Sequence, residues 1–281
     1  MFDCFMMNDE LDLLELRLNM LYPFFEKFVI VESNLTHSGK PKEMHFTNNK
    51  LRFEKFLPKI ICLQHLGHSV WSSGLAWGNE SRQRDLVLEV LKTEKPKDGL
   101  LFVSDIDEIP KPEKLFEAQC IAWETNRPVV FNMAFCMYYM NLVSEIPFRG
   151  AYLYNPDYAK EIQSYFKYDR YGPSTFRWQV TSKGHENDYP NIYDAGWHFS
   201  TVGGVETIKR KLDSYAHLEF NTQEIASDEH LLKCMAEGVP YFEKLFKFND
   251  QVLRFAKKDL SFLPDYVQFN KDKYQKYILG D

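Results

Sequence analysis

The stretch Leu100-Leu101-Phe102-Val103-Ser104-Asp105-Ile106-Asp107-Glu108-Ile109-Pro110 indicates the fold of this 281-residue chain more clearly than any other. Its apolar start, Leu100–Val103, predicts a buried strand. Asp105 and Asp107 follow at spacing i, i+2, so both carboxylates face the same way where the strand ends. Like charges this close repel each other unless a cation lies between them, and Mg2+ or Mn2+ binds carboxylates together with substrate phosphates. The stretch therefore predicts a metal–diphosphate site; the alternative is a solvated acidic turn.

The composition is that of a globular protein whose main partner is not a nucleic acid. Hydrophobic residues make up 44% of the chain and charged residues 26%, and the net charge of -6 disfavours binding to a phosphate backbone. The aromatic share of 16% suits sugar stacking but also ordinary core packing. A chain of this length can bury a full core, so we expect a single domain over residues 1–281.

The cysteines and the apolar runs bear on the cellular compartment. The five cysteines are scattered, form no CxxC motif, and predict reduced core residues rather than a disulfide framework or a zinc site. No basic and apolar leader is present at the N-terminus, and no run of about eighteen apolar residues occurs. We therefore expect a cytoplasmic protein without a signal peptide or a membrane-spanning helix. The cysteines are Cys4, Cys62, Cys120, Cys136 and Cys234.

Strands and helices alternate through the first half of the chain. Short apolar runs predict strands, and leucines at helical spacing predict the helices between them. This alternation predicts an α/β fold with a mostly parallel sheet, in which ligands bind at the carboxyl ends of the strands. Asp105 and Asp107 lie at such an end. The predicted strands are Phe2–Met7, Phe28–Val31, Ile60–Leu63 and Leu100–Val103, and the predicted helices are Leu11–Leu21 and Asn79–Leu91.

The second half is less periodic. Val129–Val143 predicts one long strand, bent near Ala134. We expect a helix from Val205 to Tyr215 after Gly203-Gly204, and a shorter one from Asp228 to Met235 with Ser227 as its N-cap and Gly238 as its stop. The tail from about Phe248 predicts helical packing or a cover for a sheet edge. Further strands are predicted at Ala151–Tyr154, Phe176–Val180 and Asp194–Ser200.

Several segments occur in the order found in one enzyme family. They are Asn8–Asn19, Phe28–Asn34 with Gly39-Lys40-Pro41, Arg82–Asp85, Asp105–Pro110, Asp194–Ser200 with Gly203-Gly204, and Ser214–His217. Together they resemble glycosyltransferase family 17, which includes the enzyme that adds the bisecting N-acetylglucosamine to N-glycans. Each segment alone is unspecific, but the ordered set is specific.

The resemblance implies a fold, a reaction and a cofactor. It implies a GT-A fold, with Rossmann-like nucleotide-sugar binding and a mostly parallel central sheet flanked by helices. Residues 1–110 would form the nucleotide-binding half, 111–245 the acceptor and catalytic half, and 246–281 a C-terminal tail. The implied reaction is metal-dependent (Mn2+ or Mg2+) and inverting, and it moves a sugar from a UDP-sugar donor, UDP-N-acetylglucosamine in the animal members, to a glycan hydroxyl. The membrane anchor and luminal stem of the animal members have no counterpart in this sequence, so we expect a bacterial or viral-type polysaccharide or glycan acceptor.

The metal ligands follow from the resemblance to other DxD enzymes. It implies that Asp107 contacts the metal directly and that Asp105 reaches the ribose or, through water, the metal. His198 is either a metal or diphosphate ligand or a buried, hydrogen-bonded core histidine. His217 and His230 compete with it for the third ligand position. Glu108 is either structural or an acceptor contact.

Two polar segments are candidates for donor binding. Glu32-Ser33-Asn34 ends a predicted strand, where it either lines the base and ribose or forms a polar turn. Arg82 and Arg84 are expected in the first turn of their helix, where the helix dipole disfavours cations, so a nearby anion would stabilise them.

Each donor-binding candidate has a structural alternative. Glu80 and Asp85 provide local partners for the two arginines. Gly203-Gly204 before a helix either presents free N–H groups to an anion or forms a tight loop.

The general base has several candidates in the sequence. An inverting transfer requires a carboxylate that accepts the proton of the acceptor hydroxyl. GT-A enzymes usually place it at the start of a helix after a glycine-rich loop, which fits Asp228 and Glu229. Glu219 is the second candidate and Asp194 the third. Acidic residues are also common at helix N-termini for structural reasons alone.

Two other functions remain as alternatives. A nucleotidyltransferase shares an α/β sheet and an acidic metal pair, but it would need an early phosphate loop rich in Gly, Arg or Lys, whereas Asn8–Leu14 is acidic. A catalytically inactive glycan-binding protein would have no need of intact Asp105 and Asp107.

Overall fold

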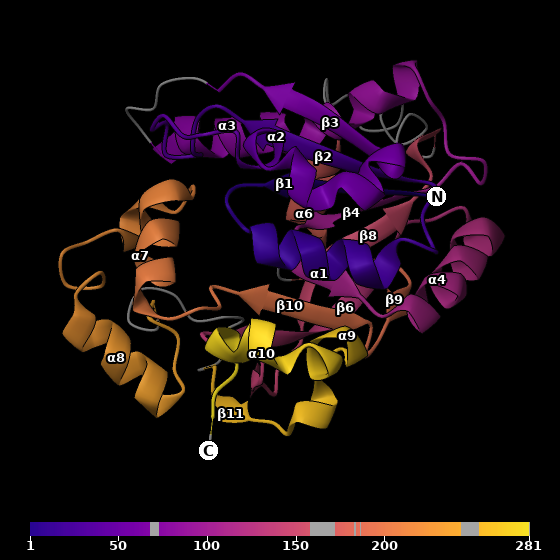
Figure 1. Ribbon diagram of the computed structural model, residues 1–281. Coiled ribbons are helices and arrows are strands. Elements are labelled where there is room, and N and C mark those ends of the chain that lie inside the picture. Colours follow the sequence, from indigo (N-terminus) through magenta and orange to yellow (C-terminus); the bar gives the residue numbers. More distant parts are fainter. Residues whose placement is uncertain (68–72, 158–171, 183, 186, 243–252, 281) are drawn as a thin grey trace.

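The computed structural model describes residues 1–67, 73–157, 172–182, 184–185, 187–242 and 253–280. Figure 1 shows a twisted central sheet with helices on both faces, and α7 and α8 grouped at one end of it. In the first half the elements are β1 (Phe2–Met7), α1 (Leu11–Leu21), β2 (Lys27–Ser33), α2 (His45–Asn48), η1 (Lys50–Lys59), β3 (Ile60–His65), α3 (Ser73–Asp85), η2 (Leu86–Lys92), β4 (Leu101–Asp105), β5 (Glu108–Pro110) and α4 (Pro112–Thr125). In the second half they are β6 (Val129–Met137), β7 (Leu142–Ser144), β8 (Phe148–Tyr154), α6 (Pro173–Thr181), β9 (Asn191–Ile192), β10 (Gly196–Ser200), α7 (Val205–Ser214), η3 (Leu218–Phe220), α8 (Asp228–Glu237), β11 (Phe255–Lys257), η4 (Leu260–Phe262), α9 (Asp265–Phe269), α10 (Lys271–Tyr274) and η5 (Gln275–Tyr277).

The first half of the sheet is parallel. Its order is β3-β2-β1-β4, and β1 pairs in parallel with both β2 and β4. Beyond β4 the sheet continues through antiparallel β8 to β6, which β10 joins in parallel. This confirms the predicted α/β fold with its parallel strands in the first half of the chain. All four parallel strands end at the same edge, so the residues that follow β1, β2 and β4 lie near one another.

Alternate residues of the parallel strands contribute to two separate cores. Phe5, Phe28 and Phe102 face one side, where α1, α4 and the C-terminal helices cover the sheet. Cys4 and Val103 face the other side, against η2 and α6. Because β1, β2 and β4 are buried on both faces, their sequences are mostly apolar, with Asp3 of β1 as a buried exception. The five cysteines are free; three of them are buried, and Cys62 and Cys120 are half-buried.

The long predicted strand Val129–Val143 is wrong in its second part. β6 ends at Met137, the chain turns through Tyr138 with a φ of 68°, and it returns as the short antiparallel strand β7. A positive φ is unusual for a tyrosine. The Tyr138 side chain is buried and donates a hydrogen bond to the Val239 backbone oxygen at 2.7 Å, which holds the turn in place.

The predicted strand Phe176–Val180 is a helix. Gly172-Pro173 starts α6, with proline in the first turn. Phe176 and Val180, four residues apart, then lie on one face against the sheet. A short apolar run at this spacing fits a strand or a helix, and the proline was the signal that distinguishes them.

The remaining elements agree more closely with the sequence. α7 begins after Gly204, and α8 runs from Asp228 to a left-handed Gly238, with the Ser227 hydroxyl accepting the His230 N–H. β11 pairs with β7 and covers that edge of the sheet. The predicted start of the tail at Phe248 and the 245/246 division lie outside the described residues. Over the part of the chain that is described, no helix combines the length and apolar character needed to cross a bilayer.

Candidate active site

The acidic loop, residues 105–108 at the end of β4, is held in place by a buried arginine. Arg17 of α1 has no exposed surface and pairs with the buried Asp3 through two hydrogen bonds of 2.8 and 2.5 Å. Its guanidinium also donates to the backbone oxygens of Asp105, Ile106 and Glu108, at 3.0, 3.3 and 2.9 Å. These bonds fix the loop backbone so that its acidic side chains project beyond the end of the sheet.

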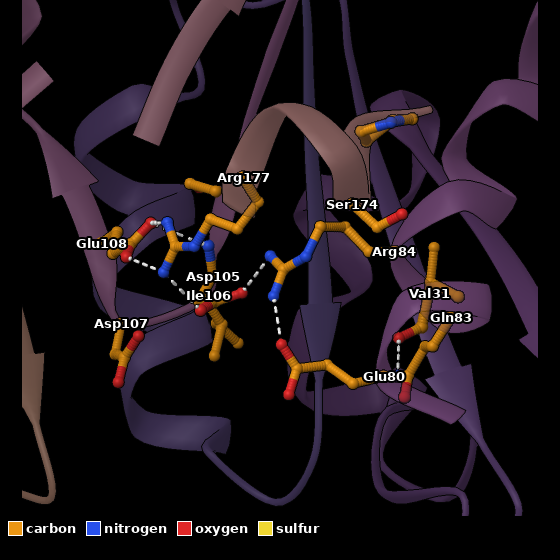
Figure 2. Close-up of polar contacts among 12 residues, drawn as sticks. Val31, Glu80, Gln83, Arg84, Asp105, Ile106, Asp107, Glu108, Ser174 and Arg177 are labelled. Carbon is orange, nitrogen blue, oxygen red and sulfur yellow. Dashed lines mark hydrogen bonds and ion pairs between the residues drawn. The ribbon is translucent and has the colours of Figure 1, made fainter. Parts of the chain in front are cut away.

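Asp105 is bound by two arginines. Its two carboxylate oxygens accept hydrogen bonds from Arg84 of α3 at 2.6 Å and from Arg177 of α6 at 2.9 Å. Figure 2 shows both guanidinium groups directed at this side chain. Burial opposes the charge of Asp105, but Arg177 and Arg84 outweigh it and hold its pKa well below the usual range.

Glu108 is a structural partner of Arg177. Its carboxylate is fully buried and accepts hydrogen bonds of 2.8 and 2.5 Å from Arg177 and of 3.0 Å from the Asp105 N–H. Gly150 of β8 makes room for this pair, because a Cβ there would lie 2.2 Å from Arg177 Nη1 and 2.6 Å from Glu108 Oε1. Of the two roles expected for Glu108, the contacts support the structural one.

Asp107 faces a different set of groups. Figure 2 shows it turned away from the two arginines that hold Asp105. Its Oδ2 lies 3.4 Å from Lys211 Nζ of α7 and 3.6 Å from His198 Nε2 of β10. Burial raises the pKa of Asp107, but the Lys211 ammonium and His198 outweigh this effect and lower it to about 2. Asp107 is therefore an ionised carboxylate without a bound arginine.

His198 lies in an aromatic pocket beside Asp107. Its ring stacks on Phe135 with centroids 5.2 Å apart and contacts Phe148 at 4.1 Å. Its Nδ1 is buried, and no described residue hydrogen-bonds to it. The second ring nitrogen is normally hydrogen-bonded both in a core histidine and in a metal-bound one, so Nδ1 does not distinguish these two roles for His198.

The residues around Asp107 fit one divalent cation through two protein ligands. Asp107 and His198 would hold it, while both oxygens of Asp105 are occupied by guanidinium groups. The described residues contain no cluster of three or more His, Cys, Asp or Glu side chains able to hold a metal. A metal of the Mg2+ or Mn2+ type uses few protein ligands when phosphate and water complete its shell, so two are sufficient.

The residues predicted to bind the base and ribose are mostly engaged in the protein. The buried Glu32 caps α2 by accepting the N–H of Phe46 at 2.6 Å and both the N–H and the hydroxyl of Thr47. Ser33 contacts His65, and Asn34 accepts the Gly67 N–H at 3.0 Å. Both carboxylate oxygens of Glu32 are thus engaged at the start of α2.

The prediction that Arg82 and Arg84 lie in the first turn of their helix is wrong. α3 begins at Ser73, so both arginines lie in its last turn, where the helix dipole favours cations. Arg84 is buried and pairs with Glu80 as well as Asp105, whereas Arg82 is exposed. The structure thus brings Arg84 to the acidic loop but leaves Arg82 on the surface.

The glycine pair before α7 forms a tight turn. Gly203 and Gly204 have φ values of 117° and 86°, which disfavour any residue with a side chain. The Gly203 N–H is already bound to the Tyr138 backbone oxygen at 3.1 Å. The turn directs α7 so that Lys211 reaches Asp107.

The carboxylates predicted as general base lie away from Asp107. Asp228 is exposed and pairs with Lys209, two positions before Lys211 on α7. Positions two apart on a helix differ by about 200°, so Asp228 and Asp107 lie on opposite sides of α7. Glu219 pairs with His217 at 2.7 Å, and Asp194 with Lys111.

The remaining candidates have surroundings of their own. Glu229 is exposed on α8. The His230 ring contacts the Tyr241 backbone oxygen at 2.8 Å. No contact joins Glu229, His217 or His230 to Asp107 in the described part of the chain.

Four residues of this region were missed by the sequence reasoning. Arg17 and Lys211 lie on correctly predicted helices, but which buried or cleft face they occupy is set by tertiary packing. Arg177 lay in the segment assigned to a strand. Glu10, which precedes α1 as its N-cap residue, lies in a segment that was noted for its charge and for the family resemblance, but no role was predicted for Glu10 itself.

Comparisons with solved structures give distant matches. TarS 1-349 of S. aureus is 13% identical, with a TM-score of 0.42 over 98% of this chain and 80% of that chain. The 4-diphosphocytidyl-2C-methyl-D-erythritol synthase of Anaerococcus prevotii is 10% identical, with a TM-score of 0.35 over 68% and 86%. Mouse xyloside xylosyltransferase 1 in its apo form is 10% identical, with a TM-score of 0.28 over 68% and 83%.

The sequence comparisons identify the family. No curated protein sequence matches the chain significantly. The model of glycosyltransferase family 17 matches residues 1–281, which is the whole chain and includes every segment on which the resemblance rests. The chain, with its acidic loop at the carboxyl end of β4, belongs to glycosyltransferase family 17.

Proposed function

We propose that this protein is a metal-dependent, inverting glycosyltransferase that moves N-acetylglucosamine from UDP-N-acetylglucosamine to a hydroxyl of a glycan or polysaccharide. Membership of the family supports glycosyl transfer in general. The observation that carries the metal-dependent reaction is Asp107, an ionised carboxylate at the end of β4 beside Lys211 and His198.

The proposed role of the site is to accept negative charge on the leaving diphosphate. A bound divalent metal would supply electrostatic stabilisation of that charge. Asp107 and His198 would hold the metal. Lys211 would contact the diphosphate once the ligand draws it away from Asp107, because an ammonium group pairs readily with phosphate.

The arginine-bound residues would act as a frame. Arg84, Arg177 and Glu108 hold Asp105 at one edge of the site, so its backbone and that of Asp107 stay fixed when the donor binds. In this proposal Asp105 keeps its arginine partners and faces the ribose side of the donor, as the resemblance to DxD enzymes implies. Pre-organisation of this kind lowers the cost of reaching the transition state.

Donor hydrolysis tests this proposal. UDP-N-acetylglucosamine would be incubated with the purified chain with and without Mn2+, and UDP release would be measured for the wild type and for Asp107→Asn. We expect Mn2+-dependent release that falls at least 100-fold in the variant. Glu113→Gln, an exposed carboxylate on α4, is the matched control and should behave as the wild type.

Other outcomes would replace the proposal. Equal UDP release by the wild type and Asp107→Asn would remove Asp107 from the reaction. Consumption of free nucleoside triphosphates instead of UDP-sugars would indicate a nucleotidyltransferase. Binding of glycans without turnover of any nucleotide sugar would indicate a catalytically inactive glycan-binding protein.

A further inference from the structure

The loop between β1 and α1 contacts α7 beside the site. Asn8 Nδ2 is 3.5 Å from Ser214 Oγ at the end of α7, and Arg210 of the same helix pairs with Asp9 at 3.1 Å. The loop is thus attached to the helix whose Lys211 reaches Asp107. Residues 8–10 therefore form one wall of the site, and Asp107 and Lys211 form the adjoining one.

Glu10 is the carboxylate that this loop places in the site. It is half-buried, and its Oε2 accepts the backbone N–H of Asn8 at 2.9 Å, which fixes the side chain on its own loop. No described residue donates a hydrogen bond to its other oxygen. Glu10 is therefore unlike Asp105 and Glu108, whose carboxylates are bound by arginine. A fixed carboxylate with one open oxygen is suited to receive a proton from a ligand.

The surroundings of Glu10 raise the pKa of its carboxyl group. Burial and the nearby Asp9 and Asp107 carboxylates raise its pKa, while the Asn8 N–H and the Lys211 ammonium lower it, and the result is a pKa of about 7. Lys42, whose ammonium lies 3.3 Å from the Asn8 backbone oxygen, also faces this loop. A carboxyl with a pKa near neutral pH accepts a proton far more readily than an ordinary glutamate.

We propose that Glu10 is the general base of the glycosyl transfer, an inference that rests on the function proposed above. Glu10 takes the proton of the acceptor hydroxyl as that oxygen forms a bond to the anomeric carbon. The bond from the anomeric carbon to the donor phosphate breaks at the same time, and the diphosphate leaves with the electron pair. Glu10 ends the step protonated and returns its proton to solvent.

Glu10 lies closer to the proposed reaction centre than the carboxylates expected from the sequence, because it belongs to the loop that contacts α7 beside Asp107. Asp107 is the proposed metal ligand, and Asp228 lies on the opposite side of α7. Glu10 interacts electrostatically with both Asp107 and Lys211, the two groups assigned to the leaving diphosphate. It is the one carboxylate of the described residues that combines this position with freedom from an arginine.

Transfer kinetics with a matched control test this assignment. The variants are Glu10→Gln, Glu10→Asp and Asp228→Asn, and the acceptor is the one for which the wild type shows turnover. We expect Glu10→Gln to lower kcat at least 100-fold, with little change in UDP binding in the presence of Mn2+ measured by calorimetry. Glu10→Asp should retain part of the activity, and Asp228→Asn should match the wild type.

The pH profile separates a base from a residue that only positions the loop. The wild-type kcat/KM should fall tenfold per pH unit below a single apparent pKa, and the residual activity of Glu10→Gln should lack this dependence. Wild-type activity in Glu10→Gln at all pH values, or a loss confined to Asp228→Asn, would overturn the assignment. Absence of turnover in the wild type with every nucleotide sugar would instead contradict the proposed function.

Discussion

Lys211 Nζ lies 3.4 Å from Asp107 Oδ2, so a lysine of α7 occupies the position next to the carboxylate at which a metal would bind. Asp107 favours the charged form of Lys211 strongly enough to outweigh the effect of burial and to raise the pKa of the lysine. Without a donor, the lysine therefore neutralises the site. A metal and a diphosphate would have to share or replace this contact.

Removal of Lys211 should separate metal binding from catalysis. In Lys211→Gln, Asp107 loses its nearest cation, so we expect the unliganded protein to bind Mn2+ about tenfold more tightly, equivalent to roughly 1.4 kcal/mol. Sugar transfer should nevertheless slow by about 100-fold or more, because the diphosphate loses a cationic partner. Calorimetry and kinetics measure the two effects.

The control for this experiment is Lys209→Gln, which removes an ammonium from the other side of α7. Lys209→Gln should change neither the affinity for Mn2+ nor the rate of sugar transfer. Weaker Mn2+ binding in Lys211→Gln would show that the lysine supports the metal site rather than competing with it.

The pairing of Arg177 with Glu108 should be important for stability. Arg177→Ala leaves the fully buried Glu108 carboxylate without its arginine, and we expect a loss of about 3–5 kcal/mol in the free energy of unfolding. Urea unfolding measures this loss. Arg82→Ala removes an exposed arginine and should stay within about 0.5 kcal/mol of the wild type. Similar effects of the two substitutions would mean that Glu108 has another partner.

Gly150 and Gly78 should respond to alanine with opposite signs. At Gly150 a Cβ would collide with the Arg177–Glu108 pair, so Gly150→Ala should destabilise the protein by about 1–3 kcal/mol. At Gly78, inside α3, a Cβ meets nothing within 4 Å, and the substitution should stabilise by up to about 1 kcal/mol. Thermal unfolding of both variants tests this pair, and a neutral Gly150→Ala would show that the ion pair can shift at little cost.

Glu10 should make stability depend on pH. Its pKa rises from an ordinary value of 4.5 to about 7 on folding, so the folded protein binds this proton more tightly than the unfolded chain. The associated stability is fully present below pH 4.5 and is lost as the pH rises to about 7. Glu10→Gln carries no such proton, so between pH 4.5 and pH 8 its free energy of unfolding relative to the wild type should rise by up to roughly 3 kcal/mol, the equivalent of this pKa change. A constant difference across this range would contradict the raised pKa.

The sequence predicts the framework of the fold well because that framework follows local rules. The buried strands of the first half read as continuous apolar runs, and α8 carries its start and stop signals in Ser227 and Gly238. The errors occur where distant contacts decide the structure. Tyr138 makes a turn in an apolar run because its hydroxyl binds Val239, and Phe176 belongs to a helix packed on the sheet.

The candidate site, like the fold, could be predicted from the sequence only in part. The acidic loop was identifiable because both carboxylates follow an apolar run, and the family match covers them. The i, i+2 spacing of the two carboxylates does not specify which arginine or lysine side chain each of them pairs with. Asp105 is bound by arginines from α3 and α6, while Asp107 faces α7, and these helices meet only in the folded chain. Glu32 shows the converse, since a polar residue at a strand end is used to cap a helix.

The buried Arg17 gives the acidic loop a dependence on the N-terminal part of the chain. Its guanidinium satisfies three carbonyl oxygens of the loop, and its charge is balanced by Asp3 in β1. The loop is consequently not a portable module. Grafting residues 104–108 onto another α/β scaffold would transfer the carboxylates but not the arginine beneath them, so a redesigned site of this type would have to be moved together with β1 and α1.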